Sequence, residues 1–250
     1  MASRLTWIFT TRTGGTSEGP FASLNLSLSV GDDPQRVLEN RRRVMEQLQL
    51  GADGSVAQAS QEHGHRLLWV EGERCPRSPS PAGNGRWQVV GRGDGLLTCR
   101  PGQALAVLVA DCAPVLLAHP QSGWVAAVHA GWRGLAAGIV ERAVQALRQA
   151  CQGDLAGVSA WVGPCIRACC YRVGAEVARA VGAGARRRGG QWFVDVMEAA
   201  VERLAAAGVD PSRIWADGRC TACCEELFFS YRRDGPRSGR MAGLILRQEG

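Results

Sequence analysis

The sequence lacks any apolar run long enough to span a bilayer, which excludes a protein built from membrane-spanning helices. Its start, MASRLTWIFTTRTGG, lacks the continuous apolar core and the small-residue cleavage pattern of a signal peptide. Ten cysteines fall below the density of a disulfide scaffold, and the adjacent pairs Cys169–Cys170 and Cys223–Cys224 suit ordinary disulfides poorly. We therefore expect a soluble protein of the reducing cytoplasm, without a membrane partner.

The composition is that of an ordinary globular protein, with 46% hydrophobic and 21% charged residues. The net charge of +6 comes mostly from arginine and suits an anionic small molecule or nucleic acid. A basic patch interleaved with aromatic residues is missing apart from FFSYRR, so we expect no nucleic-acid partner. We find no internal repeat and no clear linker, and we predict a single domain over residues 1–250.

The order of predicted elements indicates the fold class. Asp33 and Pro34 predict the start of a helix that Gly51 ends, and residues 71–93, rich in Pro, Gly and Ser, predict a long surface loop. Strands and helices are interleaved without strict alternation, which predicts an α+β protein with a mixed, largely antiparallel β-sheet core flanked by helices. The expected strands are Leu5–Thr11, Ala104–Ala118, Trp124–Ala130, Ser159–Val162, Arg213–Trp215 and Met241–Leu246, and the further helices Leu135–Leu147, Val173–Val181 and Val194–Ala207.

The stretch ADCAPVLLAHPQSGWVAAVHAGWRG contains a predicted hairpin with HPQSG as its turn. A turn centred between Pro120 and Gln121 places Cys112 directly opposite His129, with Cβ atoms about 5 Å apart. A thiolate and an imidazole at that separation could share a metal ion or a proton, although a bulge at Pro114 would shift the register. The alternative is a buried cysteine that packs as a small hydrophobe beside a hydrogen-bonded histidine. For the pair together, we favour a functional site.

Basic residues predict where an anion would bind. Arg133, in the Gly-Trp-Arg-Gly turn before a helix expected near Leu135, is a candidate phosphate ligand or else forms a surface salt bridge. Arg232, in SYRRDGPRSGR, is either a ligand for ribose or phosphate or part of a solvated loop. Asn25 is a weaker candidate for contact with a sugar or base. Asp94 is interpreted as a turn residue.

A zinc site with an open position needs a third protein ligand beside the cysteine and the histidine. The candidates are His63, His65 and His119, and spacing does not separate the first two, whereas we expect His119 to be solvated in the turn. The C-x-x-C spacing of CTAC would also suit a second, structural zinc, but packing of buried thiols is our preferred interpretation of the extra cysteines.

The motifs in order along residues 7–245 resemble those of the laccase-domain proteins, which are called multicopper polyphenol oxidoreductases and were later assigned to purine nucleoside metabolism. Some members are described as peptidoglycan-editing factors. The resemblance implies a metal site formed by His63, Cys112 and His129, and Ser27 departs from the glycine usual at its position. The matching segments are FASLNLSLSVGDDPQRVLENRRR, QEHG, GDGLLT, ADCAPVLLAHP, VAAVHAGWRG, VGPCI, CCYRVGAEV and CTACCEELFFSYRRDGPRSGRMAG.

From this resemblance we expect a zinc-dependent enzyme whose partners are a purine nucleoside and phosphate. It would phosphorolyse adenosine- or inosine-type nucleosides to the base and ribose 1-phosphate, and deaminate adenosine. His63, Cys112 and His129 would be the catalytic residues, because a zinc ion with an open position lowers the pKa of bound water towards neutrality. Copper is the alternative metal. The sequence indicates no oligomeric state.

Three other functions compete with this expectation. Cys112 and His129 could form the nucleophile and base of an amide hydrolase that edits a peptidoglycan precursor. A copper-dependent polyphenol oxidase is a second alternative, but four histidines cannot supply both a blue-copper centre and a multinuclear copper cluster. The third is a binding protein in which the three metal ligands only stabilise the fold.

Overall fold

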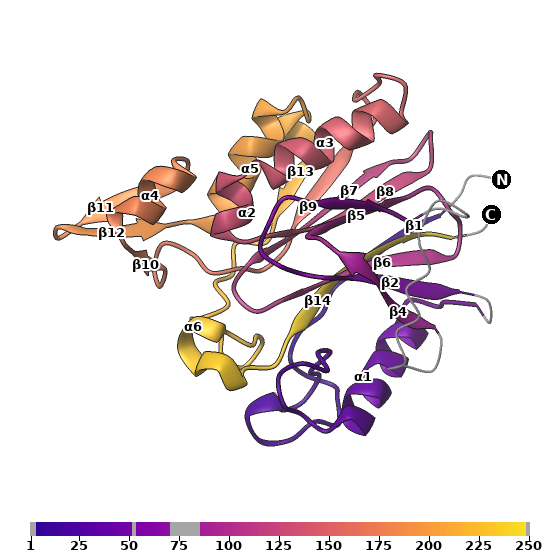
Figure 1. The fold of residues 1–250 in the computed structure, drawn as a ribbon, viewed down its shortest axis with the longest axis horizontal. Helices are drawn as coiled ribbons and strands as arrows, with labels where there is room; N and C mark the ends of the chain where they lie inside the picture. Colours follow the sequence, from indigo (N-terminus) through magenta and orange to yellow (C-terminus); the bar gives the residue numbers. More distant parts are fainter. Residues whose placement is uncertain (1–3, 52–53, 71–85, 249–250) are drawn as a thin grey trace.

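The computed structural model describes residues 4–51, 54–70 and 86–248 and shows two large β-sheets (Figure 1). Both sheets are mixed and most of their strand pairs are antiparallel, and a small antiparallel sheet adds a third. The first sheet has the order β1 (Leu5–Phe9), β14 (Met241–Arg247), β6 (Gln103–Val109), β2 (Ser55–Ser60) and β4 (Trp87–Arg92). The second has the order β13 (Ile214–Ala216), β9 (Ser159–Val162), β7 (Ala113–His119), β8 (Trp124–Ala130), β5 (Gly95–Thr98) and β3 (Leu67–Trp69).

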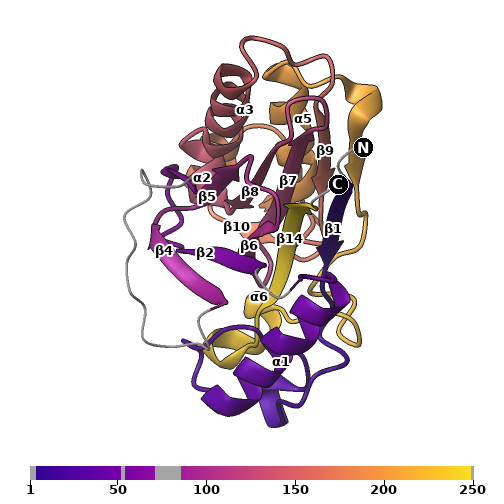
Figure 2. The same ribbon diagram turned by 90° about the vertical axis from the view of Figure 1, so that its right-hand side faces the viewer.

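Helices cover the outer faces of the two large sheets. Figures 1 and 2 show α3 (Ile139–Ala150) and α5 (Val196–Ala206) on the six-stranded sheet, and α1 (Pro34–Gln47) against the five-stranded sheet at the opposite side. The α+β class with helices flanking a mixed, mostly antiparallel core is therefore confirmed. In the described residues no helix is long and apolar enough to cross a membrane.

The alternation of side chains along β6 and β7 forms three apolar layers. Leu105 and Val107 of β6 pack with Leu116 of β7 between the two sheets, whereas Ala104 and Ala106 pack on the α1 side. Every residue of both strands is buried, because each strand is covered on both faces. The core thus holds the ends of β6, β7 and β8 rigidly with respect to one another.

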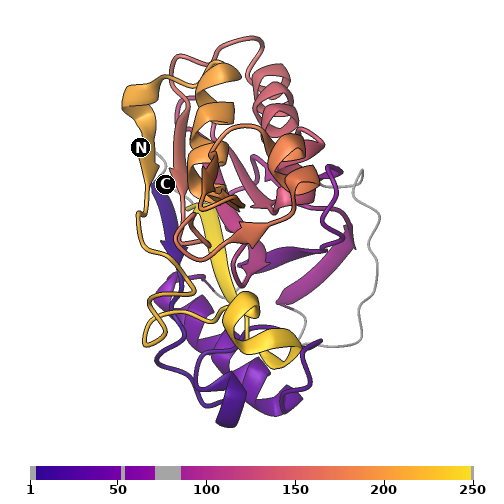
Figure 3. The same ribbon diagram turned by 90° about the vertical axis from the view of Figure 1, so that its left-hand side faces the viewer.

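The small sheet and α4 (Ala175–Val181) form a projection at one end of the molecule (Figure 1). The small sheet has the order β10 (Arg172–Val173), β12 (Gln191–Val194) and β11 (Ala185–Arg188), and α4 packs on it. The short helix α6 (Tyr231–Asp234) precedes β14 and lies towards the same end of the molecule as α1 (Figure 3).

Several sequence-based boundaries were wrong. The predicted strand 104–118 is two strands, β6 and β7, which belong to different sheets and are separated at residues 110–112, where Asp111 adopts a φ of 89°. The predicted helix 135–147 is broken at Gly138, whose φ of 79° separates α2 (Trp132–Ala136) from α3. The helix α1 ends at Gln47, before Gly51.

The predicted loop 71–93 contains the strand β4, which pairs in parallel with β2 and buries Trp87 in the core beside α1. Its residues 71–85 lie outside the described part of the chain. Because the stretch is rich in Pro, Gly and Ser up to Gly85, composition concealed the apolar residues Trp87, Val89 and Val90 that follow.

Candidate metal centre

The β7–β8 hairpin brings Cys112 and His129 together, although not in the predicted register. Pro114 pairs with His129 and His119 pairs with Trp124, so the turn is centred between Gln121 and Ser122 and Cys112 is not directly opposite His129. The register differs from the prediction by two residues. Because side chains alternate faces with a period of two, Cys112 still lies on the same face as His129, as its diagonal neighbour.

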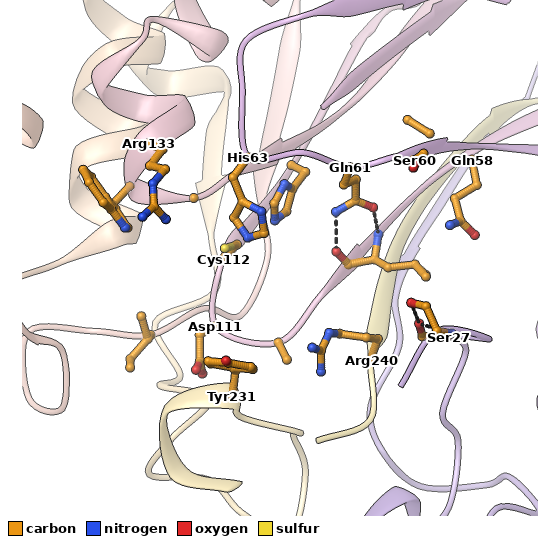
Figure 4. A pocket seen from close by; sticks show the side chains of 18 of the residues that line it. Ser27, Gln58, Ser60, Gln61, His63, Asp111, Cys112, Arg133, Tyr231 and Arg240 are labelled. Atoms are coloured by element: carbon orange, nitrogen blue, oxygen red, sulfur yellow. Dashed lines mark hydrogen bonds between the residues drawn. The ribbon is translucent and has the colours of Figure 1, made fainter. Parts of the chain in front are cut away.

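His63 completes a group of three donor side chains. Its ligand atom and those of Cys112 and His129 all lie within 4.8 Å of one another, and the two imidazole rings are 4.8 Å apart at 81° (Figure 4). His63 follows the end of β2 in a turn where its φ is 58°, and its side chain is exposed. Of the other candidates, His65 is exposed outside this group, and His119, expected to be solvated, is buried at the end of β7 beside Ser122.

Asp94 holds this group in place. The buried carboxylate accepts hydrogen bonds from the backbone N–H groups of Glu62 (3.3 Å), His63 (2.9 Å) and Gly64 (2.7 Å), and from His129 Nδ1 at 2.8 Å. Burial raises its pKa, but the hydrogen bonds from His129 and from the backbone outweigh this effect, and the pKa is lower than normal. The interpretation of Asp94 as a turn residue missed this function, since only the fold brings GDG next to QEHG.

Cys112 and His129 form a strongly coupled pair. Burial raises the pKa of the Cys112 thiol, but the charge of His129 and hydrogen bonds from both histidines lower it to about 6. For His129, burial lowers the pKa, but the Cys112 thiolate and Asp94 raise it to about 9. Each group thus favours the charged form of the other, and a cation bound to the thiolate and the imidazole would displace the imidazolium proton.

Gly131 makes room for the three side chains. A Cβ at this position would lie 2.8 Å from Cys112 Sγ and 3.4 Å from His63 Cδ2, and the backbone has an ordinary φ of −84°. The glycine is therefore required by the close approach of the thiol and not by its own conformation. This explains the first glycine of the Gly-Trp-Arg-Gly turn.

The group lies on the wall of a cavity of about 810 Å³. Four arginines and a single carboxylate are the charged residues among the described lining, so the cavity suits an anion. Figure 4 shows Arg133 on one side of His63 and Cys112, with Arg240 and Gln58 on the other side. The lining includes Ser27, Arg41, His63, Asp111, Cys112, His129, Arg133, Tyr171, Tyr231, Arg232 and Arg240.

Arg133 and Arg232 both reach the cavity. The Arg133 guanidinium lies 4.5 Å from the Trp132 ring centre, and its side chain makes no hydrogen bond or ion pair with any described residue. Arg232 donates from Nη1 to the Arg172 carbonyl (2.8 Å) and lies 4.6 Å from the Tyr171 ring centre. The expected helix start near Leu135 is corrected, since α2 begins at Trp132 and already contains Arg133.

Asn25 does not reach the cavity. It is fully buried, its amide donates to the carbonyl of Ser27 (3.0 Å) and to Asp32 (2.9 Å), and its Oδ1 accepts from the Arg240 backbone N–H (2.9 Å). The expected contact with sugar or base is therefore replaced by a positioning function, since Ser27 and Arg240 both line the cavity.

The sequence reasoning undervalued two further lining residues. Gln61 exchanges two hydrogen bonds of 2.7 Å with the backbone of Leu108 and so fixes the start of the His63 turn to β6. Burial lowers the pKa of the Arg240 guanidinium, which donates from Nη1 to the Gly239 carbonyl (3.0 Å) and lies 5.8 Å from the Tyr231 ring centre. Asp111 accepts from Thr221 Oγ1 (2.6 Å) and from the Arg232 backbone N–H (2.7 Å), and so joins the segment before Cys112 to the segment around α6. Gln61 is the first residue of the QEHG motif that contains His63, and this position was the signal in the sequence that Gln61 helps to place His63.

Comparison with known proteins places the chain in a family. The sequence model of the family described as "Multi-copper polyphenol oxidoreductase laccase" matches residues 6–248. The chain belongs to this laccase family. Its relatives include "Purine nucleoside phosphorylase YlmD" of Geobacillus stearothermophilus, 38% identical over 96% of this chain and 89% of the relative. "Purine nucleoside phosphorylase YfiH" of Escherichia coli is 37% identical over 94% of this chain and 90% of its own.

Solved structures of the laccase family share the fold. The crystal structure of YlmD from Geobacillus stearothermophilus has a TM-score of 0.87 at 37% identity and covers 98% of this chain and 92% of that chain. The crystal structure of the Bacillus licheniformis hypothetical protein YfiH has a TM-score of 0.85 at 32% identity and covers 97% of this chain and 92% of that chain. Membership in the laccase family and the group formed by His63, Cys112 and His129 both indicate a metal-binding protein.

Proposed function

We propose that the protein is a zinc-dependent purine nucleoside enzyme that phosphorolyses adenosine- or inosine-type nucleosides and deaminates adenosine. The observation that carries this proposal is the placement of two histidines and a thiolate on the wall of an 810 Å³ cavity with four arginines and one carboxylate. The printed names of the relatives, purine nucleoside phosphorylase, support the same class of reaction.

The three donors fit zinc. Two imidazoles and one thiolate are typical zinc ligands, and three protein ligands leave a fourth position for water or substrate. Asp94 accepts a hydrogen bond from His129 Nδ1–H, so Nε2 of the same ring is free to bind a metal, as is usual for metal-ligating histidines. A zinc ion held by these residues supplies Lewis acidity at the cavity wall.

Phosphorolysis needs an oxygen of phosphate held against C1′ of the ribose. The bond between C1′ and N9 breaks, the new bond between oxygen and C1′ forms, and the base leaves with the electron pair and takes the proton that phosphate gives up. We assign the binding of phosphate to Arg133, because all donors of its guanidinium are free among the described residues, with Arg232 as a second contact.

Deamination uses the same nucleoside in a different reaction. Water adds at C6 of the purine ring and ammonia leaves, so this reaction needs no phosphate. Tyr231, which is exposed, and Tyr171 present aromatic rings in the cavity against which a purine can stack. Cys112 and the two histidines are assigned to metal binding in both reactions.

The proposal is tested by mass spectrometry of the products. Metal-loaded protein incubated with adenosine should yield inosine without phosphate, and adenine with ribose 1-phosphate when phosphate is present. Removing the metal with a chelator should abolish both, and adding zinc back should restore them. If neither product forms with metal-loaded protein, the proposed function is wrong.

Arg133→Ala separates the two reactions. We expect the KM for phosphate to rise about 10- to 150-fold, because charge-assisted hydrogen bonds are worth about 1.5–3 kcal/mol, while adenosine deamination changes by less than a factor of two. Steady-state kinetics with varied phosphate measure the effect, and Arg179→Ala, on the exposed face of α4, is the control. An equal loss in both reactions would show that Arg133 does not bind phosphate.

The Cys–His amide hydrolase remains the second candidate, because the Cys112 thiol has its pKa lowered to about 6 beside His129. The two functions respond differently to the chelator. A thiolate nucleophile needs no metal, so cleavage of an amide in a peptidoglycan precursor by the metal-free protein would favour the hydrolase.

A further inference from the structure

Four cysteines outside the candidate metal centre lie close together. Cys169 and Cys170 lie in the turn after β9, and Cys220 and Cys223 lie in the segment between β13 and α6. Their Sγ atoms all lie within 4.8 Å of one another, and Cys223 Sγ is 3.5 Å from Cys169 Sγ and 3.3 Å from Cys170 Sγ. The fold thus brings together side chains about fifty residues apart.

The size of this cluster suits a single ion. Tetrahedral zinc binds four cysteine sulfurs at about 2.3 Å, which places neighbouring sulfurs about 3.8 Å apart. The observed separations lie close to that value, so the four thiolates could close on one ion through rotation of their side chains. Four soft sulfur ligands in a compact tetrahedral set favour zinc over harder cations such as magnesium or calcium.

Burial separates this cluster from ordinary packing of thiols. Cys169 and Cys223 are exposed and Cys170 is partly exposed, and only Cys220 is buried. A cysteine that packs as a small hydrophobe is among the most buried residue types. The preferred interpretation from the sequence, packing of buried thiols, is therefore wrong for Cys169 and Cys223.

The backbone around Cys220 is arranged to support a thiolate. Burial raises the pKa of the Cys220 thiol, but nearby backbone N–H groups, those of Arg167, Cys223 and Ala222 among them, lower it below its usual value. An isolated backbone β-bridge pairs Cys165 with Cys220, both of which are free thiols, and the Thr221 N–H donates to the Cys165 carbonyl (3.1 Å). These backbone contacts hold the two segments in register. Such donors around a sulfur are typical of the surroundings of a metal ligand.

We propose that Cys169, Cys170, Cys220 and Cys223 bind a second zinc ion, with a structural function, because the fold brings their four sulfurs within 4.8 Å. Each of the two segments provides two ligands: the turn after β9 provides the adjacent cysteines, and the segment before α6 provides the C-x-x-C pair. The site shares no residue with His63, Cys112 and His129 and does not depend on the proposed function.

The second site stabilises one wall of the cavity. Tyr171 follows Cys170 directly, and the Arg232 guanidinium lies on its ring. On the other segment, Thr221 donates to Asp111, which also accepts from the Arg232 backbone N–H. An ion that joins the two segments therefore fixes Tyr171 and Arg232 relative to each other.

Metal analysis of three variants tests the site. Protein purified from zinc-supplemented medium and passed through a desalting column is analysed by elemental mass spectrometry. Cys112→Ala, which removes a ligand of the first site, should retain about one zinc per chain, and Cys112→Ala combined with Cys223→Ser should retain none. The matched control combines Cys112→Ala with Cys224→Ser, which changes the neighbouring cysteine outside the cluster, and should still retain one zinc. Absence of zinc from Cys112→Ala overturns the proposal.

A second measurement uses the unmutated protein and does not depend on the folding of a variant. Iodoacetamide should alkylate the exposed Cys169 and Cys223 at least about 10-fold more slowly in zinc-loaded protein than after zinc is removed, because a bound thiolate is a poor nucleophile. Peptide mass spectrometry gives the rate at each cysteine. Equal rates in the two samples, or recovery of the Cys170–Cys223 pair as a disulfide in zinc-loaded protein, overturn the proposal.

Discussion

Replacing His63 with alanine should lower the rate of nucleoside turnover by at least about 100-fold while the fold stays intact. Loss of an outer hydrogen-bond partner of a metal ligand typically costs 10- to 100-fold in affinity or activity, and loss of the ligand itself should cost more. The side chain is exposed and makes no contribution to the apolar core, so its removal leaves the packing unchanged. The effect should therefore appear in kcat and in zinc content, and not in the free energy of unfolding of the metal-free proteins, because bound zinc itself stabilises the folded state.

The control is His65→Ala, which removes an exposed histidine two residues away and should leave the turnover within a factor of two. Kinetics, zinc content and thermal unfolding of the two variants are measured together. An amide hydrolase would need only Cys112 and His129. Cleavage of an amide by metal-free His63→Ala protein would therefore favour that function. A large fall in the stability of the metal-free His63→Ala protein would instead indicate that His63 stabilises the fold without a metal.

The proximity of Cys112 and His129 could be predicted because it depends on strand pairing within one short hairpin. The prediction placed the turn one position too early along the chain and so misjudged the register by two residues, yet both registers place the two side chains on one face. A shift of one residue would have separated them. The identity of the third ligand could not be derived in this way, since His63 lies in a turn far from the hairpin in the sequence, and Asp94 joins that turn to His129 only in the fold.

The features that the sequence concealed depend on contacts between distant segments. The apolar stretch 104–118 contains Asp111 as its single charged residue, and this one signal did not reveal the break between β6 and β7. Both strands are covered on both faces and share one composition. Asn25 carries polar atoms suited to a ligand, but its partners Asp32 and Arg240 come from different parts of the chain. The cysteines of the second site likewise lie close together because a backbone β-bridge pairs Cys165 with Cys220.

Asp94→Ala should both weaken zinc binding at the first site, by about 10- to 100-fold, and destabilise the protein by about 2–3 kcal/mol. The carboxylate is fully buried and accepts from three backbone N–H groups and from His129, so alanine leaves several donors without an acceptor. Competition with a chromophoric chelator gives the zinc affinity of the unmutated and variant proteins, and urea unfolding of the metal-free proteins gives the stability. Asp154→Ala, at an exposed carboxylate near His119, is the control for stability and should change it by less than about 0.5 kcal/mol.

Asp94→Asn distinguishes the two contributions of this residue. The amide oxygen can accept from part of the His63 turn, but the amide nitrogen cannot accept from the backbone or from His129, so stability should recover only in part. The proton of His129 Nδ1 would lose its anionic acceptor, and the ring would no longer be held as the tautomer that offers Nε2 to a metal. We therefore expect zinc affinity to stay low even where stability recovers. If affinity and stability recovered together, Asp94 would act on the metal site only by holding the turn, and its bond to His129 would have no separate effect on metal binding.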